Sequence, residues 1–122
     1  MRTPILKQGR VLIATIQATT SDKDLKEFQD ELAEKVGRFR TCGVIIDVTA
    51  MDVIDSFATR TLAVIAGATK LRGAETIVVG IQPEVAFAMV QMGLTLIGAR
   101  TALDLEEGLT LLQTPTDQDA KI

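Results

Sequence analysis

Histidine, tyrosine and tryptophan are all absent from this 122-residue chain, and these absences narrow the chemistry that it can perform. Without histidine the commonest general base is missing, so Ser-His-Asp and Cys-His catalytic sites are excluded. Metal sites built from histidine and several cysteines are excluded as well, because the chain has one cysteine, Cys42. The four phenylalanines are too few to predict platforms on which nucleic-acid bases stack.

Disulfides, phosphate-binding loops and membrane segments are missing too. A single cysteine cannot form an internal disulfide, which fits a reducing cytoplasm, and we interpret Cys42 as structural or merely tolerated. Neither a G-x-x-x-x-G-K-[ST] nor a G-x-G-x-x-G motif is present. The N-terminus lacks the apolar core of a signal peptide, and the longest mostly apolar run, 85–99, is too short to span a bilayer. We therefore expect a cytoplasmic protein that uses no cofactor and has no membrane partner.

The composition that remains is that of an ordinary globular domain. Apolar residues make up 47% of the chain and charged residues 24%, which is enough apolar material for one buried core. The net charge of −3 argues against a nucleic-acid partner. The polar segment 114–122 follows the last apolar pattern, so we expect one domain over 1–113 and a disordered C-terminal tail.

Short apolar runs alternate with amphipathic stretches along the chain. This alternation predicts an α/β fold with a mostly parallel sheet of about five strands and four helices, in the order β-β-α-β-α-β-α-β-α. The expected strands are 5–8, 11–16, 44–48, 75–80 and 101–104. The first helix follows a cap at Ser21 and carries an apolar stripe to Phe39, and the other expected helices are 56–71, 83–92 and 105–112.

The third expected helix, 83–92, has few polar positions. A helix that is apolar nearly all round needs cover on several sides. Two sources of cover are open: the core of this domain, or the surface of a partner. The second helix also has a wide apolar arc, and a domain that exposed both would carry an apolar patch larger than monomers usually tolerate. We therefore expect an oligomer whose interface uses apolar residues of the first and third helices or the neighbouring edge of the sheet.

The stretch 44–60 joins a continuous apolar strand to the start of a helix. Such a run is typical of a central strand buried on both faces. Asp55 is a good N-cap, which places Ser56 at the first helical position. In an open α/β sheet the loop after a strand's carboxyl end is where ligands and partners dock. The hypothesis is that Ser56 carries the function of the protein.

Three carboxylates lie in the same stretch, Asp47, Asp52 and Asp55. One interpretation is a Mg²⁺ site at which an aspartate accepts phosphate, since hard cations bind clustered oxygens. The other is that Asp47 binds backbone groups of the loop, Asp52 is solvated and Asp55 caps the helix. The second is favoured, because no acid directly follows the strand 11–16.

A phosphate on Ser56 would gain from the positive end of the helix and would be repelled by Asp52 and Asp55. Arg60, one turn further on, could reach back to it. Such a modification would change the local charge by about −1.5 to −2, as a surface switch requires. Thr59 is the competing acceptor.

Segment 51–57 resembles the phosphorylation segment of STAS-domain anti-sigma-factor antagonists, and in particular the RsbS-type proteins of bacterial stressosomes. Further matching segments extend the resemblance over nearly the whole chain: 4–7, 43–47, 80–83 and 101–109. The pair Phe57-Ala58 departs from simpler antagonists, which have Ser or Thr and then Gly there, and this favours the scaffold branch.

The resemblance implies a STAS (SpoIIAA-like) fold, no catalytic activity, and phosphorylation of Ser56 by an RsbT-type serine kinase that the protein sequesters and then releases. It also implies RsbR-type STAS paralogues as partners in homo- and hetero-oligomers, and an RsbX-type phosphatase that resets the serine. The kinase-binding surface would consist of Asp52, Asp55, Ser56, Phe57 and Arg60. A STAS-like domain that binds a small ligand or nucleotide remains an alternative.

Overall fold

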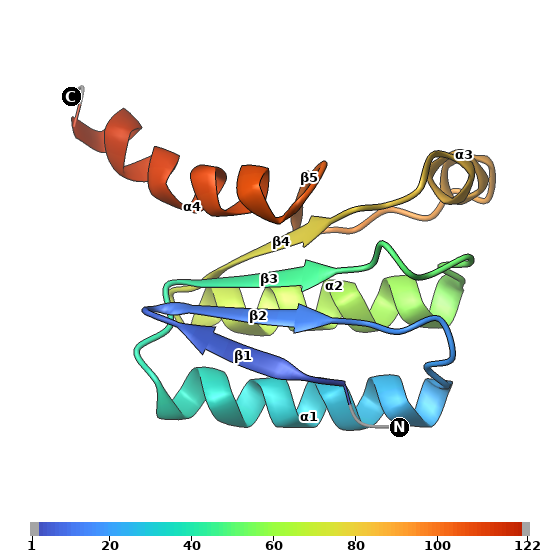
Figure 1. Ribbon diagram of the computed structural model, residues 1–122, viewed down its shortest axis with the longest axis horizontal. Coiled ribbons are helices and arrows are strands. Elements are labelled where there is room, and N and C mark those ends of the chain that lie inside the picture. The colour runs from blue at the N-terminus through green and yellow to red at the C-terminus, as the bar shows by residue number, and fades with distance from the viewer. Residues whose placement is uncertain (1–2, 121–122) are drawn as a thin grey trace.

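The computed structural model describes the backbone of residues 3–120 and the side chains of residues 3–113. Its elements follow the predicted order, with five strands and four helices (Figure 1). The strands are β1 (Ile5–Gln8), β2 (Val11–Thr15), β3 (Gly43–Asp47), β4 (Glu75–Val79) and β5 (Arg100–Ala102). The helices are α1 (Asp22–Arg38), α2 (Ser56–Leu71), α3 (Pro83–Gln91) and α4 (Leu105–Ala120).

The strands lie in the sheet in the same order as in the sequence. β1 and β2 form an antiparallel hairpin, and its turn uses Gly9 at a φ of +60°, which glycine adopts without strain. All other neighbours are parallel, with Ile13, Ile45 and Ile77 paired across three adjacent strands. The carboxyl ends of β2 to β5 therefore share one edge of the sheet, from which four loops lead into the helices.

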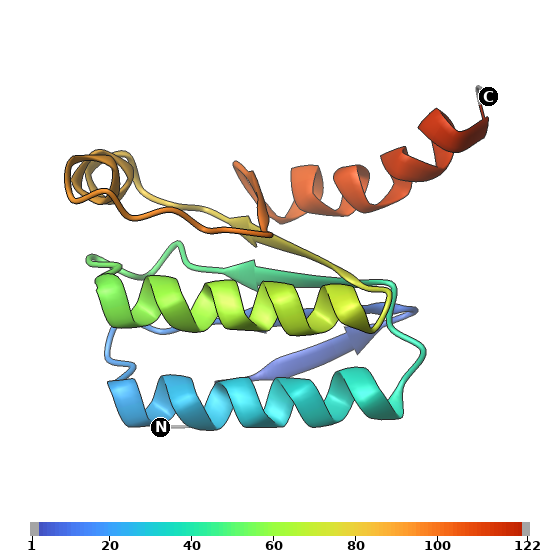
Figure 2. The same cartoon turned by 180° about the vertical axis from the view of Figure 1, so that it is seen from behind.

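Helices α1 and α2 lie side by side on one face of the sheet (Figures 1 and 2). The stripe predicted for α1 is buried there, and Ser21 with Asp24 forms the capping box at its start. The sheet contributes β3, whose residues Val44, Ile45 and Ile46 are fully buried, as expected for a strand covered on both faces. The main core lies between this face and the two helices.

Helix α4 covers the other face, over β3, β4 and β5 (Figure 1). Leu109 and Leu112 pack against a second cluster that includes Ile45 and Ile77. α4 continues to Ala120, beyond the predicted 105–112. Because the side chains after Gln113 and residues 121–122 lie outside the described part, the division into a domain over 1–113 and a tail stays a prediction.

Helix α3 lies past the carboxyl end of β4 (Figure 1). It buries Val85 and Met89 in the main core, while Phe87, Val90 and Met92 are 72%, 76% and 67% exposed. The core therefore covers only one side of this apolar helix. None of the helices in the described part is long and apolar enough to cross a membrane.

Four strands differ from the predicted ranges by one or two residues at one or both ends: β2, β3, β4 and β5. β4 stops at Val79 because Gly80 turns the chain at a φ of +82°. β5 stops at Ala102 because Asp104 accepts a hydrogen bond from the Glu107 N–H at the start of α4. β2 stops at Thr15 rather than at residue 16.

Candidate functional site

Ser56 is the first residue of α2 and is exposed. Asp55 is the N-cap, as predicted, and its Oδ1 accepts a hydrogen bond of 2.8 Å from the Ala58 N–H. The preceding loop is held by two buried side chains, Met51 and Ile54, which are 8% and 4% exposed. Because these anchors fix the loop in the core, the serine hydroxyl is presented to solvent on a rigid helix end.

The loop is also braced by polar contacts at the carboxyl ends of β3 and β4. Asp47 Oδ1 accepts hydrogen bonds from the Thr49 N–H at 2.9 Å and from the Thr49 hydroxyl at 2.6 Å. Gln82 Nε2, just before α3, donates to the Thr49 carbonyl at 2.7 Å. At Gly80 an added Cβ would lie 2.0 Å from Thr49 Oγ1. Thr49 and Gln82 are thus supporting residues that the side-chain chemistry of the sequence did not indicate. Gln82 lies in the matching segment 80–83, whereas Thr49 lies outside every matching segment and had no signal in the sequence.

The three aspartates do not converge on one point. Asp47 is engaged with Thr49, Asp55 caps α2, and Asp52 is exposed. Among the described residues no group of three or more Asp, Glu or Cys side chains could hold a metal ion. The geometry agrees with the interpretation of these aspartates as loop and helix-end residues and gives a Mg²⁺ site no ligand set.

The remaining predicted site residues differ in accessibility. Arg60 is exposed one turn after Ser56, and Phe57 is half-buried against the main core. Thr59 is only 5% exposed, and its hydroxyl has no hydrogen-bond partner. Of the two candidate acceptors, only Ser56 is accessible in the folded chain.

The buried hydroxyl of Thr59 has a measurable consequence for stability. Burial of an unpaired hydroxyl costs free energy, so Thr59→Val should raise the free energy of unfolding by about 1–2 kcal/mol. Urea denaturation followed by circular dichroism measures this change. Thr69→Val on the same helix is the comparison and should lose stability, because the Thr69 hydroxyl is also buried but hydrogen-bonds the Ala66 carbonyl and the Thr76 hydroxyl. A loss of stability in Thr59→Val would contradict the unpaired state of this hydroxyl.

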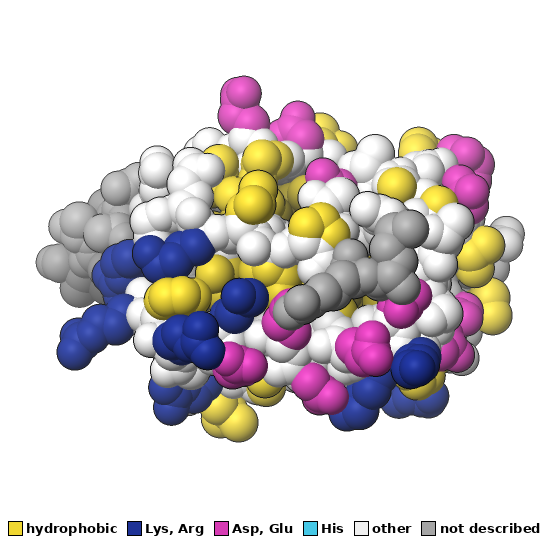
Figure 3. All heavy atoms as spheres, turned by 60° about the horizontal axis from the view of Figure 1, so that its bottom comes forward, with side chains coloured by type: hydrophobic (Ala, Val, Ile, Leu, Met, Phe, Trp, Pro, Cys, Tyr) yellow, Lys and Arg dark blue, Asp and Glu magenta, His cyan; other side chains and the backbone are white. Residues whose placement is uncertain are grey.

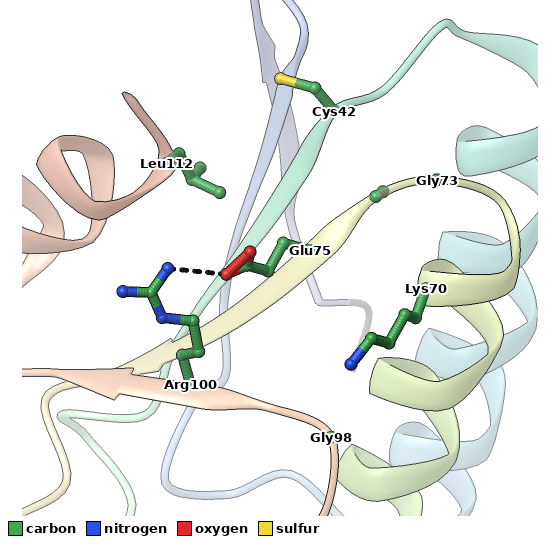
Figure 4. Close-up of a pocket in the computed structure, with 8 residues that line it drawn as sticks. Cys42, Lys70, Gly73, Glu75, Gly98, Arg100 and Leu112 are labelled. Carbon is green, nitrogen blue, oxygen red and sulfur yellow. Dashed lines mark hydrogen bonds and ion pairs between the residues drawn. The ribbon is translucent and has the colours of Figure 1, made fainter. Parts of the chain in front are cut away.

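A hollow of about 440 Å³ opens at the other edge of the sheet, far along the strands from Ser56 (Figure 4). Glu75 and Arg100 form an ion pair of 2.8 Å in it, and Lys70 and Cys42 are among the lining residues. The thiol of Cys42 is half-buried and free. This hollow takes no part in the Ser56 site.

The model of the STAS domain family matches residues 3–108. The chain belongs to the STAS domain family. Among solved structures it is similar to a serine-to-glutamate variant of RsbS from Moorella thermoacetica, with 35% identity and a TM-score of 0.82, covering 94% of this chain and 97% of that one. It is also similar to a chain from a structure of the stressosome, described as a signal integration and transduction hub, with 36% identity, a TM-score of 0.78 and coverage of 93% and 98%.

Curated relatives are longer proteins. RsbRA of Bacillus subtilis, an RsbT co-antagonist, is 26% identical over 108 residues, which are 88% of this chain but 39% of that protein. The chain thus spans about two fifths of this relative. The anti-sigma-factor antagonist SpoIIAA, at 12% identity and a TM-score of 0.74, shares the fold. The predicted STAS (SpoIIAA-like) fold and the resemblance to RsbS-type proteins are confirmed.

Proposed function

We propose that this chain is a non-catalytic component of a cytoplasmic stressosome that sequesters an RsbT-type serine kinase and releases it when Ser56 is phosphorylated. The observation that carries the proposal is an exposed serine at the N-terminus of α2, in a chain similar to RsbS over nearly its full length. The relative RsbRA is an RsbT co-antagonist, which supports a kinase of that type as the partner.

The start of α2 offers favourable chemistry for a phosphate. The Ala58 N–H is already used by the Asp55 cap, but the N–H groups of Ser56 and Phe57 have no acceptor among the described residues. Free N–H groups and the helix dipole favour an anion at this end of a helix. The exposed guanidinium of Arg60 adds a cation one turn away. Phosphorylation is thereby compatible with the fold.

The same phosphate would act on a bound kinase by repulsion. Asp52 and Asp55 are exposed beside Ser56, so the surface is acidic before modification. A further charge of about −1.5 to −2 on that surface changes its potential without moving the core. We propose that the kinase binds the surface formed by four exposed residues and the half-buried Phe57: Asp52, Asp55, Ser56, Phe57 and Arg60.

Intact mass spectrometry after incubation with the cognate kinase and ATP tests the proposal. The expected product carries one phosphate, is stable in acid, and maps by fragmentation to the peptide that contains Ser56. An acid-labile adduct would instead indicate an aspartyl phosphate. The absence of any adduct with an active kinase would refute the proposed switch.

Ser56→Asp should weaken kinase capture, because it adds a negative charge beside Asp52 and Asp55. A carboxylate carries less charge than a phosphate, so we expect a loss of affinity of about tenfold, smaller than that of the phosphoprotein. Surface plasmon resonance with immobilised kinase measures it. Thr95→Asp is the matched control, since it adds the same charge at an exposed position outside the proposed surface. Equal affinity of the unmodified protein, Ser56→Asp and the phosphoprotein would contradict the release step.

Assembly with RsbR-type paralogues and with further copies of the chain is part of the proposal. The large apolar side chains left exposed include Phe87 and Val90 on α3, Met92 and Ile97 after it, and Leu103 before α4. α1, which was also expected to contribute, leaves no large apolar side chain exposed. An RsbX-type phosphatase would reach Ser56 while this scaffold persists.

Light scattering should therefore show an oligomer whose mass is nearly unchanged by phosphorylation. The reason is that Ser56 supplies none of the exposed apolar side chains, so phosphorylation removes no apolar group from the contact. Phe87→Ser, at an exposed position, should reduce the oligomer mass, whereas Thr95→Ser should not. A strictly monomeric protein at tens of micromolar (about the range where weak contacts are populated), alone and with its paralogue, would contradict this assembly.

A further inference from the structure

Arginines gather at the edge of the sheet opposite Ser56, where the amino ends of the parallel strands meet. A cleft of about 480 Å³ opens there between the β1–β2 turn, the end of α1 and the turn after α2. Among the residues with described side chains, no aspartate or glutamate lines it, and four arginines do: Arg10, Arg38, Arg40 and Arg72. Figure 3 shows Lys and Arg side chains clustered at the end of the molecule where α1 finishes in Figure 1.

Most of this positive charge is not neutralised by the residues whose side chains the structure describes. Arg38 forms an ion pair with Glu34 one turn earlier in α1. The Nε of Arg10 donates to the Arg40 carbonyl at 3.1 Å, so the two terminal nitrogens of Arg10 remain available to a ligand. Within the described part of the chain, Arg40 and Arg72 pair with no carboxylate. Three guanidinium groups thus share the cleft without an ion pair to any carboxylate of the described residues.

The negative C-terminal ends of the helices at this edge of the sheet are too weak to neutralise the arginines. The C-termini of α1 and α2 each carry roughly half a negative charge, so together they balance about one cation. Lys35 and Arg38 already lie in the last turn of α1, and Lys70 lies in that of α2. The adjacent hollow in Figure 4 shows the contrasting case, because there Arg100 is neutralised by Glu75.

Like charges that are held close together repel one another and destabilise the fold. A bound anion would reduce the repulsion between these arginines. Guanidinium groups bind phosphate oxygens through two parallel N–H donors each, and several of them together select a ligand with more than one anionic centre. The volume of the cleft lies within the range of small-molecule sites.

We propose that this arginine cleft binds a small ligand with two adjacent anionic groups, of the diphosphate class. Arg40 and Arg72 supply the main contacts from either side, and the terminal nitrogens of Arg10 supply the third. The proposal does not depend on the function of Ser56, which lies at the other edge of the sheet.

Isothermal titration calorimetry of the full chain with pyrophosphate tests the site. We expect binding with a Kd of about 1 mM or tighter, and about a tenfold loss in the double variant Arg40→Gln/Arg72→Gln. The matched control, Lys23→Gln/Lys26→Gln, removes two positive charges from the first turns of α1 and should bind as the unmodified chain does. Circular dichroism establishes that both variants are folded. Nuclear magnetic resonance of the unmodified chain gives a readout that needs no variant: the amide signals of Thr41 and Gly73 should shift with pyrophosphate, and that of Ser56 should not.

Three results would overturn the proposal. One is no pyrophosphate binding in the millimolar range, with unshifted amide signals in the cleft. Another is an equal loss of binding in the lysine control, which would indicate attraction by general charge. The last is binding of poly-glutamate without pyrophosphate, which would assign the cleft to an acidic protein surface instead.

Discussion

Replacing Ser56 by alanine should abolish phosphate incorporation by the cognate kinase and leave the fold intact. The serine side chain is exposed and caps nothing, since the N-cap contact is made by Asp55. Alanine at an exposed first-turn position changes stability by about 0.5 kcal/mol or less. Intact mass spectrometry measures the modification, and thermal unfolding by circular dichroism measures the stability. Loss of the adduct with an unchanged melting temperature is the expected pair of results.

Thr59→Val is the control that separates the two candidate acceptors. Its hydroxyl is buried, so its removal should leave phosphate incorporation at the rate of the unmodified protein. Phosphate uptake by Ser56→Ala at that same rate would show that the assignment is wrong. Uptake lost in Thr59→Val but retained in Ser56→Ala would require α2 to open before it is modified.

Gly80→Ala should have the largest effect on stability among the substitutions near the site. A non-glycine residue at a φ of +82° costs about 1–2 kcal/mol. The added Cβ would also lie 2.0 Å from Thr49 Oγ1 and 3.2 Å from Asp47 Oδ1, and relief of such overpacking typically costs a further 1–3 kcal/mol or so. We expect the free energy of unfolding in urea to fall by about 3 kcal/mol.

Gly73→Ala is the matched control for backbone strain. Its φ of +83° is nearly the same, but an added Cβ there meets no atom within 4 Å. Its free energy of unfolding should therefore fall only by the cost of the backbone strain, about 1–2 kcal/mol. The double variant Gly80→Ala/Thr49→Ala should recover part of the loss, because the hydroxyl that clashes is gone. If Gly80→Ala costs no more than Gly73→Ala, the close contact between the end of β4 and Thr49 does not control stability.

Local patterns in the sequence determined which elements form and where α1 and α2 begin. The stripe of Leu25, Phe28 and Leu32 at helical spacing, and the unbroken apolar run of β3, each specify one type of element without reference to distant residues. Caps act over three residues, so Asp55 and the position of Ser56 could be predicted as well. A resemblance spread over the chain then indicated the family, which the comparisons confirmed.

Only the tertiary structure decided which side chains are accessible and which distant segments meet. Ser56 and Thr59 are three residues apart, yet one is exposed and the other is buried, because burial depends on what packs against each side of α2. The bracing of Thr49 by Gln82 joins positions 33 residues apart. The arginine cleft takes side chains from three segments, near 10, 38–40 and 72. Such contacts carry no periodic signal, since they arise only when the parallel strands fix their register and bring the loop ends together at each edge of the sheet.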